Sequence, residues 1–290
     1  MAKQGSRAVV STKGKVLRAL VWLFMLILAL VTIFPVVYII LGSFKSNVEL
    51  LVGGSNIFPT QWHPENYLKA WTNANFARYT MNSLTISVGV MLLSLFFSTM
   101  AGYVFSRTTF KFKDIIYGIF IAFMFINVGS VSIRPLFELA VKLHMNNNLI
   151  SIILISVGSG QATFIFLARG FVDGVPRDLD EAAKIDGCSF FGTFWRIILP
   201  VLKPVMATIA LLSFRQGWNE YIMPLVFTMS NERMRPLTVG VNMLKSTGGG
   251  AADWNVMFAG ATIAIVPMLI VYCCFSKYFM GGSTAGAVKG

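Results

Sequence analysis

Long stretches without a charged residue are the feature that most restricts what this chain can fold into. Five of them are 19 to 28 residues long, and a sixth apolar segment carries Arg215 and Glu220 within it. A bilayer core about 30 Å thick needs roughly 20 apolar residues in α-helical form. The sequence therefore predicts an all-α integral membrane protein with six transmembrane helices, at about residues 19–44, 79–106, 115–133, 149–168, 200–227 and 254–276.

The composition agrees with a membrane protein and argues against a nucleic-acid-binding protein and a disulfide-stabilised scaffold. Apolar residues make up 56% of the chain and charged residues 12%, whereas a soluble protein has about 25% charged residues. The net charge of +12 is spread thinly between the apolar stretches, so we expect no nucleic-acid partner. Three cysteines make no disulfide framework, and His63 and His144 have no partners at metal-ligand spacing. We therefore expect no metal site.

The distribution of lysine and arginine predicts the orientation. With the N-terminus in the cytoplasm, the inner segments carry 15 of these residues and the outer segments eight, in the direction of the positive-inside rule. We therefore predict a cytoplasmic N-terminal segment at 1–18, a transmembrane domain at 19–280 and a cytoplasmic C-terminal tail at 281–290. The first apolar stretch is too long for a secretory signal and no small-residue cleavage site follows it, so we expect a retained anchor.

The connection after the fourth predicted span, at about 173–200, carries the strongest motif. Pro176 can open a helix, and acidic residues including Glu181 follow it, where a helix N-terminus favours negative charge. Gly187 can take the positive φ that ends a helix. Aromatic residues then recur at helical spacing over 190–198. The pattern predicts a cytoplasmic helix–turn–helix, which is either a docking surface or a connector without a partner.

This segment resembles a known family. The letters EAAKIDG at 181–187, with the isoleucine of IILP ten residues after the glycine, are similar to the EAA signature of ABC-importer permeases. The flanking segments AGYVFSR at 101–107, WNEY at 218–221 and TAGAVKG at 284–290 narrow the resemblance. They are typical of the carbohydrate (maltose-type) branch, and of its MalG-like subunits in particular. The resemblance extends over essentially the whole chain from the first span onward.

The resemblance implies a membrane-spanning permease subunit of a binding-protein-dependent ABC importer, which brings a carbohydrate, expected to be an oligosaccharide, into the cytoplasm. It implies a heterodimer with a second permease subunit, two ATPase subunits and an extracytoplasmic sugar-binding protein, in the plasma (inner) membrane of a bacterium or archaeon. The chain has no P-loop lysine motif. We therefore expect that it is not an enzyme and binds no cofactor, and that ATP and Mg belong to the partner ATPases.

Two alternatives remain open. A six-span channel or an ion-coupled secondary carrier would need no EAA-type projection, and a carrier would need titratable groups facing a pathway. An ABC importer for a non-sugar solute is the other alternative, and only the resemblance of the tail and of WNEY argues against it.

Three sets of site residues are implied by the resemblance. Coupling to the ATPase is assigned to Glu181, Ala182, Ala183, Asp186, Gly187, Ile197, Leu199 and Pro200. Contact with the ATPases through the tail is assigned to Thr284, Ala285, Gly286, Lys289 and Gly290. Contact of the last outer loop with the docked binding protein is assigned to Gly248, Gly249 and Gly250.

Polar side chains within the spans are candidates for contact with the substrate, because they are costly in the membrane unless they face a cavity or a partner helix. The candidates are Asn127, Ser130, Trp218, Asn219, Glu220 and Tyr221. The competing interpretation is hydrogen bonding between helices and, for the two aromatic rings, packing. For Arg215 we expect a partner within the fold, either Glu220 or Asn219.

Arg134 departs from the family pattern, since a charge at the outer end of the third span is unusual there. Glu138 lies four residues further on, which favours a structural salt bridge. The alternative is that Arg134 contacts the substrate, in which case the sugar would be acidic.

Overall fold

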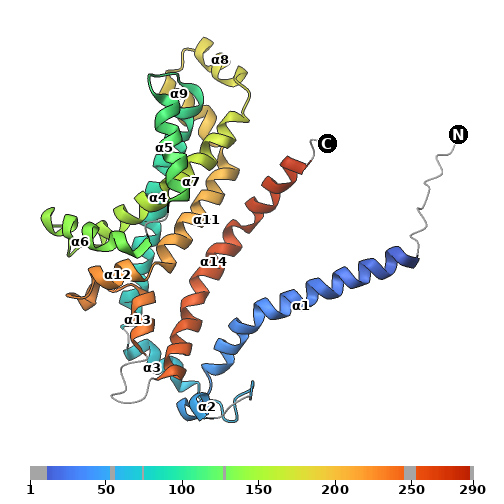
Figure 1. The fold of residues 1–290 in the computed structure, drawn as a ribbon, viewed down its shortest axis with the longest axis vertical. Helices are drawn as coiled ribbons and strands as arrows, with labels where there is room; N and C mark the ends of the chain where they lie inside the picture. Colours follow the sequence, from blue (N-terminus) through green and yellow to red (C-terminus); the bar gives the residue numbers. More distant parts are fainter. Residues whose placement is uncertain (1–11, 53–55, 74, 127–128, 245–252, 288–290) are drawn as a thin grey trace.

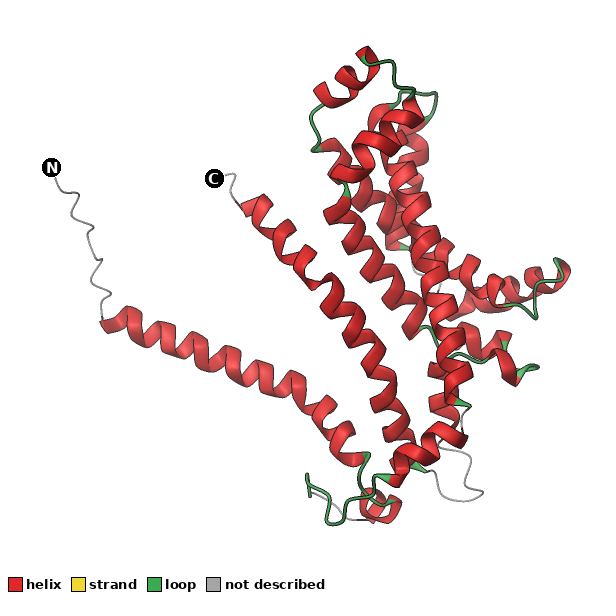
Figure 2. Cartoon of the chain, turned by 180° about the vertical axis from the view of Figure 1, so that it is seen from behind, coloured by secondary structure: helices red, strands yellow, loops and turns green. Residues whose placement is uncertain are grey.

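The computed structural model describes residues 12–52, 56–73, 75–126, 129–244 and 253–287, and these residues form helices and connecting loops without a strand (Figures 1 and 2). The α-helices are α1 (Thr12–Gly42), α2 (Asn47–Val52), α3 (Glu65–Asn73), α4 (Phe76–Arg107), α5 (Lys113–Phe125), α6 (Ile133–Lys142), α7 (Leu149–Asp173), α8 (Asp178–Ile185), α9 (Phe190–Thr193), α10 (Leu199–Val201), α11 (Lys203–Asn219), α12 (Ile222–Phe227), α13 (Leu237–Met243) and α14 (Trp254–Ala287). Shorter helical turns are η1 (Gly129–Ser132), η2 (Phe194–Ile198, a π-helix) and η3 (Glu232–Met234).

Four of the described helices, α1, α4, α7 and α14, are each long and apolar enough to cross a membrane. Two pairs of helices are bent, α5 with Gly129–Lys142 at an angle of 116° and Phe190–Val201 with α11 at 81°, and the number of spans is six if each pair is one span. The apolar stretches thus located all six segments. They did not reveal that the third and fifth are broken.

The breaks fall inside the predicted spans. The third was predicted to continue to residue 133, but α5 ends at Phe125 after 13 residues, or about 20 Å of helix at 1.5 Å per residue. The fifth was predicted at 200–227, but it bends at Leu202 before α11, and α11 then ends at Asn219 before α12 begins at Ile222. Hydropathy averages over such short interruptions, because the residues on both sides are apolar.

The core lies where α4, α7, α11 and α14 pack together. Small residues on α4 face its neighbours, among them the fully buried Ser87, Ser94 and Ser98. A Cβ added to Gly217 of α11 would lie 2.8 Å from the Cα of Ser87, so the two backbones nearly touch. Small residues serve this purpose in membrane helix packing, where burial of apolar surface cannot drive association.

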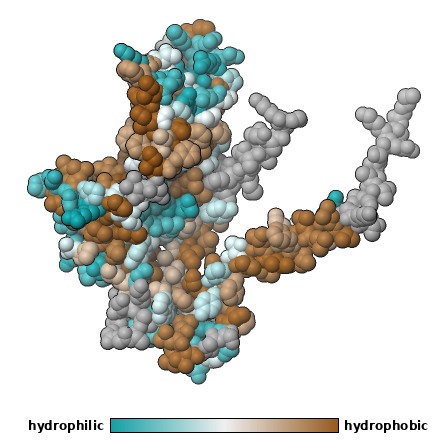
Figure 3. Space-filling model, viewed as in Figure 1, coloured by the Kyte–Doolittle hydropathy of each residue, from teal (hydrophilic) through white to brown (hydrophobic). Residues whose placement is uncertain are grey.

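Helix α1 leaves the bundle and contacts it only near the helix's C-terminal end, so that most of α1 extends away from the other helices (Figures 1 and 2). Its surface is hydrophobic along its length (Figure 3). Exposed side chains such as Trp22, at 73%, and Leu17, at 65%, point in several directions around it. A helix that is apolar on all sides must be covered by lipid or by protein.

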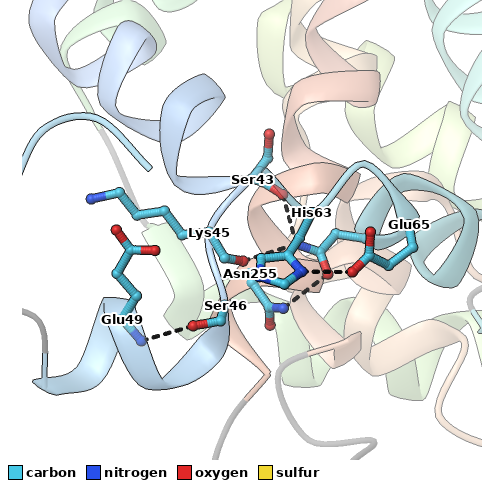
Figure 4. Close-up of polar contacts among 8 residues, drawn as sticks. Ser43, Lys45, Ser46, Glu49, His63, Glu65 and Asn255 are labelled. Atoms are coloured by element: carbon cyan, nitrogen blue, oxygen red, sulfur yellow. Dashed lines mark hydrogen bonds and ion pairs between the residues drawn. The ribbon is translucent and has the colours of Figure 1, made fainter. Parts of the chain in front are cut away.

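A buried polar junction fixes the end of α1 to α3 and α14 (Figure 4). The Asn66 amide donates hydrogen bonds of 2.9 Å to the carbonyl oxygens of both Ser43 and Lys45, and Asn255 donates one of 3.0 Å to the Asn66 Oδ1. Beside it, the Glu65 carboxylate lies 2.7 Å from the His63 ring. A backbone hydrogen bond and the His63 side chain hold the pKa of Glu65 below its usual value. We call the six residues named here the polar junction.

Candidate functional site

The predicted helix–turn–helix is present, and α8 projects from one end of the bundle (Figure 1). Glu181 is one of three acidic residues in the first turn of α8, where the helix dipole favours negative charge. Gly187 has a φ of +78°, a left-handed conformation that residues with a side chain rarely adopt. The Ser189 side chain then accepts a backbone hydrogen bond of 3.1 Å and caps α9. We call residues 173–200 the α8–α9 element.

The residues assigned to ATPase coupling divide between the surface and the interior of this element. Exposed positions are Glu181, Ala182, Asp186, Gly187 and Pro200. Ala183 is only 1% exposed, and Ile197 and Leu199 pack beside the buried cluster that contains Ile198. The Ala183 side chain therefore faces the chain's own interior, whereas the Ala182 side chain is exposed. Hydrophilic side chains gather at this end of the molecule (Figure 3).

An ion pair that the sequence did not reveal joins α8 to the end of α4. The Asp180 Oδ2 lies 2.9 Å from the Arg107 Nε, and the Arg107 side chain is only 7% exposed. The Tyr103 hydroxyl donates a 3.2 Å hydrogen bond to the Asp180 Oδ1, and the Arg107 guanidinium donates one of 2.6 Å to the Val175 carbonyl. The only sequence signal for this ion pair was the AGYVFSR segment. It contains Tyr103 and Arg107 but does not indicate which residues they contact.

A cavity of about 440 Å³ lies beside this ion pair, between α4 and the α8–α9 element. Tyr103 and Arg107 of α4 line one side of it, and Asp180, Lys184 and Cys188 line the α8–α9 side. The ion pair therefore joins the two sides at the edge of the cavity.

A larger cavity, of about 820 Å³, opens beside α7 at the level of the two broken spans. The break after α5 borders it at Ile126 and Gly129, and the interruption between α11 and α12 borders it at Glu220 and Ile222, whereas Leu202, at the bend before α11, does not line it. Within a membrane, backbone that is not helical is tolerated only where protein covers it or where it lines a water-filled cavity. The breaks and the cavity are therefore parts of one feature, which we call the lateral cavity.

The predicted substrate residues are not all at this cavity. Ser130 and Glu220 line it, whereas Trp218 is 3% exposed, stacks on Phe214 and donates its indole N–H to the Ala264 carbonyl. These contacts favour packing, not sugar stacking, for Trp218. The exposed Asn219 ends α11, and the half-buried Tyr221 lies in the break that follows. Asn127 lies outside the described residues.

Arg215 does not have the partner that we expected. Among the described residues it forms no ion pair with Glu220 and no side-chain hydrogen bond with Asn219, and it is exposed. The reason is the end of α11, after which Glu220 takes extended backbone and leaves the helical register. Its neighbour Gln216 does bond between helices, to the Ser156 carbonyl at 2.7 Å.

The salt bridge expected for Arg134 is present, with 3.1 Å between the Arg134 Nε and the Glu138 Oε1. Both side chains are exposed, at 89% and 59%. They lie on α6, which leaves the bundle to one side (Figure 1), and neither lines the lateral cavity.

The two remaining sets of predicted residues lie at or beyond the edges of what the structure describes. Helix α14 continues to Ala287, so the backbone of Thr284, Ala285 and Gly286 extends the last span. Lys289 and Gly290 lie outside the described residues, as do the three glycines of the outer loop, Gly248, Gly249 and Gly250.

Broken spans around a cavity within an apolar bundle are the architecture of a membrane transport protein. The chain belongs to the family described as the binding-protein-dependent transport system inner membrane component, whose family model matches residues 8–280. This confirms the family to which the EAA-like segment pointed.

Individual relatives match over nearly the whole chain. The arabinooligosaccharides transport system permease protein AraQ of Bacillus subtilis (strain 168) is 35% identical over 97% of this chain and 99% of its own length. The probable starch degradation products transport system permease protein AmyC of Thermoanaerobacterium thermosulfurigenes is 36% identical over 91% of this chain and 94% of its own. A solved bacterial ABC transporter involved in import of the acidic polysaccharide alginate has the same fold, with a TM-score of 0.79 at 23% identity over 93% of this chain and 98% of that one.

Proposed function

We propose that this chain is the membrane-spanning permease subunit of an ABC importer that carries an oligosaccharide into the cytoplasm. The relatives named above support the substrate class, since their names specify arabinooligosaccharides and starch degradation products. The structural support for the proposal is the lateral cavity, because two interruptions of the spanning helices line it. A sugar has many hydroxyl groups, which free backbone groups at such interruptions can bind.

The exposed surface of α8 is the proposed docking site for the partner ATPase. Glu181 and Ala182 present a carboxylate and a small side chain on the outer face, and Ile185, at 87% exposed, adds an apolar contact. Asp186 and Gly187 shape the turn. ATP and Mg would be bound by that ATPase and not by this chain.

A second permease subunit is the proposed partner within the membrane. Arg215 is exposed near the outer end of α11 and has no partner in the described part of this chain. An arginine in the hydrocarbon core costs roughly 2.5–3.5 kcal/mol on insertion scales, so lipid is a poor environment for it. We infer that this edge of α11, with Asn219 and Glu220 beyond it, faces the second subunit across a hydrated substrate pathway.

Both termini are proposed to lie in the cytoplasm, on the side of α8. In Figure 1 the end of α14 points toward the same end of the molecule as α8, which supports this orientation together with the lysine and arginine distribution. Thr284, Ala285, Gly286, Lys289 and Gly290 would then reach the ATPases. Gly248, Gly249 and Gly250 would lie outside, where an extracytoplasmic sugar-binding protein docks.

Uptake by the reconstituted complex tests this proposal. The chain would be co-expressed with the second permease and the ATPase encoded with it, inserted into proteoliposomes, and supplied with the binding protein and a panel of labelled oligosaccharides. We expect uptake of at least one oligosaccharide that requires both ATP and binding protein. Uptake without either of them would favour a channel or a secondary carrier instead, and uptake of only non-sugar solutes would contradict the substrate class.

A further inference from the structure

We propose that Arg107 and Asp180 make α8 and the inner end of α4 a single moving body, so that ATPase movement at α8 drives α4 directly. The chain itself connects the α8–α9 element to α7 before it and to α11 after it. Helix α4 has no such covalent connection to α8. The inference rests on the proposed function and names two positioning residues for it.

Helix α8 has little else to hold it against the bundle. Ala183 is its only buried residue, and a cavity lies between the helix and α4. Beside that cavity the Asp180 carboxylate contacts two groups from the last turns of α4. It forms an ion pair with the Arg107 guanidinium and accepts a hydrogen bond from the Tyr103 hydroxyl. An ion pair with side chains 7% and 21% exposed is only weakly screened by salt.

The same two turns of α4 hold the rest of the α8–α9 element. The Ser106 hydroxyl donates a 2.5 Å hydrogen bond to Asp173 at the end of α7. The Tyr103 ring lies 4.7 Å from the ring of Phe190 and 5.2 Å from that of Phe194. One end of α4 thus contacts four parts of the α8–α9 element: Asp173 at the start of the element, the Val175 carbonyl, Asp180 of α8, and the rings of Phe190 and Phe194.

The opposing possibility is that α8 pivots while α4 stays in place. Asp180 and Arg107 would then separate in every transport cycle, and each would be left as a charge in a partly buried site. Separation of this kind is strongly unfavourable, because neither charge regains its full hydration. A pair that stays intact transmits movement without that cost.

Neutralisation of the aspartate tests the inference in the complete importer. Asp180→Asn removes the ion pair and keeps the shape, Asp180→Glu keeps the charge, and Asp114→Asn neutralises an exposed aspartate in the first turn of α5 as a matched control. For each we would measure ATPase co-purification, ATP hydrolysis with and without binding protein, and uptake. We expect Asp180→Asn to keep the ATPase bound and its basal hydrolysis, but to lose binding-protein-stimulated uptake about tenfold or more. Asp180→Glu should retain most uptake, and Asp114→Asn all of it.

Two outcomes of that series would overturn the inference. Normal uptake by Asp180→Asn would mean that the pair transmits nothing, and loss of the bound ATPase would mean that it only shapes the docking site. The wild-type complex reports separately on the proposed function, because its ATP-dependent uptake does not depend on how α8 is linked to α4.

A covalent link gives a second, independent measurement. In a chain with Cys188, Cys273 and Cys274 changed to serine, Arg107→Cys and Asp180→Cys would be joined by a short bifunctional thiol reagent. If α8 and α4 move together, the cross-linked complex should recover uptake relative to the same double variant without cross-link. Uptake that falls further on cross-linking would show that the two helices must separate, and would reject the inference.

Discussion

Gly102 of α4 lies so close to α7 that a Cβ added to it would stand 2.7 Å from the Cβ of Ala168. The backbone nitrogen of Arg169 would be 2.8 Å away, so the obstacle is partly backbone and cannot rotate aside. Contact at this distance holds the C-terminal halves of α4 and α7 together, next to the α8–α9 element.

Gly102→Ala should destabilise the protein even though alanine is the better helix former. The added methyl group forces α4 and α7 apart, and overpacking of this kind costs typically about 1–3 kcal/mol. Gly170→Ala is the matched control, because nothing lies within 4 Å of its added Cβ. Thermal unfolding of the purified protein in detergent should show a lower midpoint for Gly102→Ala and an unchanged or higher one for Gly170→Ala. Equal midpoints would contradict the close packing.

Asn66→Leu should disrupt the polar junction. The change leaves the Ser43 and Lys45 carbonyls and the Asn255 amide without their partner, and each unsatisfied buried group costs about 1–3 kcal/mol. We expect a lower unfolding midpoint and faster proteolysis of the loop between α1 and α3. Lys69→Ala, an exposed change on the same helix, should leave both measurements as in the wild type.

Much of this architecture could be predicted from the sequence, because the signals are local. Apolar stretches locate the spans, and the glycine at 187 locates the turn with positive φ. The break before Gly129 and the end of α11 at Asn219 could not be predicted, since they depend on the cavity that both border. Nor could the contact between Tyr103 and Asp180, which are 77 positions apart and meet only after α7 has crossed back beside α4.

Glu181→Lys should weaken ATPase association. The change reverses a charge on the exposed face of α8 and places a cation at a helix N-terminus, where the dipole disfavours it by about 0.3–1 kcal/mol. Asp178→Lys carries the same dipole penalty in the same turn, so it serves as the control. We expect ATPase co-purification and uptake to fall more for Glu181→Lys. Equal losses would assign the effect to the helix and not to docking.

Arg215→Leu should leave the fold of the isolated chain intact and reduce transport by the complex. Among the described residues no ion pair of Arg215 is lost, and leucine is favoured over arginine in the membrane by roughly 3 kcal/mol or more. An unchanged or higher unfolding midpoint together with lower uptake would fit a residue that faces the second permease or the pathway. Normal uptake would instead indicate that Arg215 reaches the membrane surface, and Arg215→Lys would then also be neutral.

Thiol accessibility should reveal the orientation of the bundle. In a chain whose three native cysteines are serine, Ile185→Cys places a thiol on α8, and Met229→Cys places one just after α12, in the connection that the sequence predicts to lie outside. The native side chains are 87% and 69% exposed, so both thiols should be reachable once the reagent is on their side. A membrane-impermeant maleimide added to intact cells, with the outer membrane permeabilised where there is one, should label Met229→Cys and not Ile185→Cys. Disruption of the plasma membrane should allow both to react. Labelling of Ile185→Cys alone in intact cells would place α8 outside. This result would contradict the proposed docking of a cytoplasmic ATPase on α8.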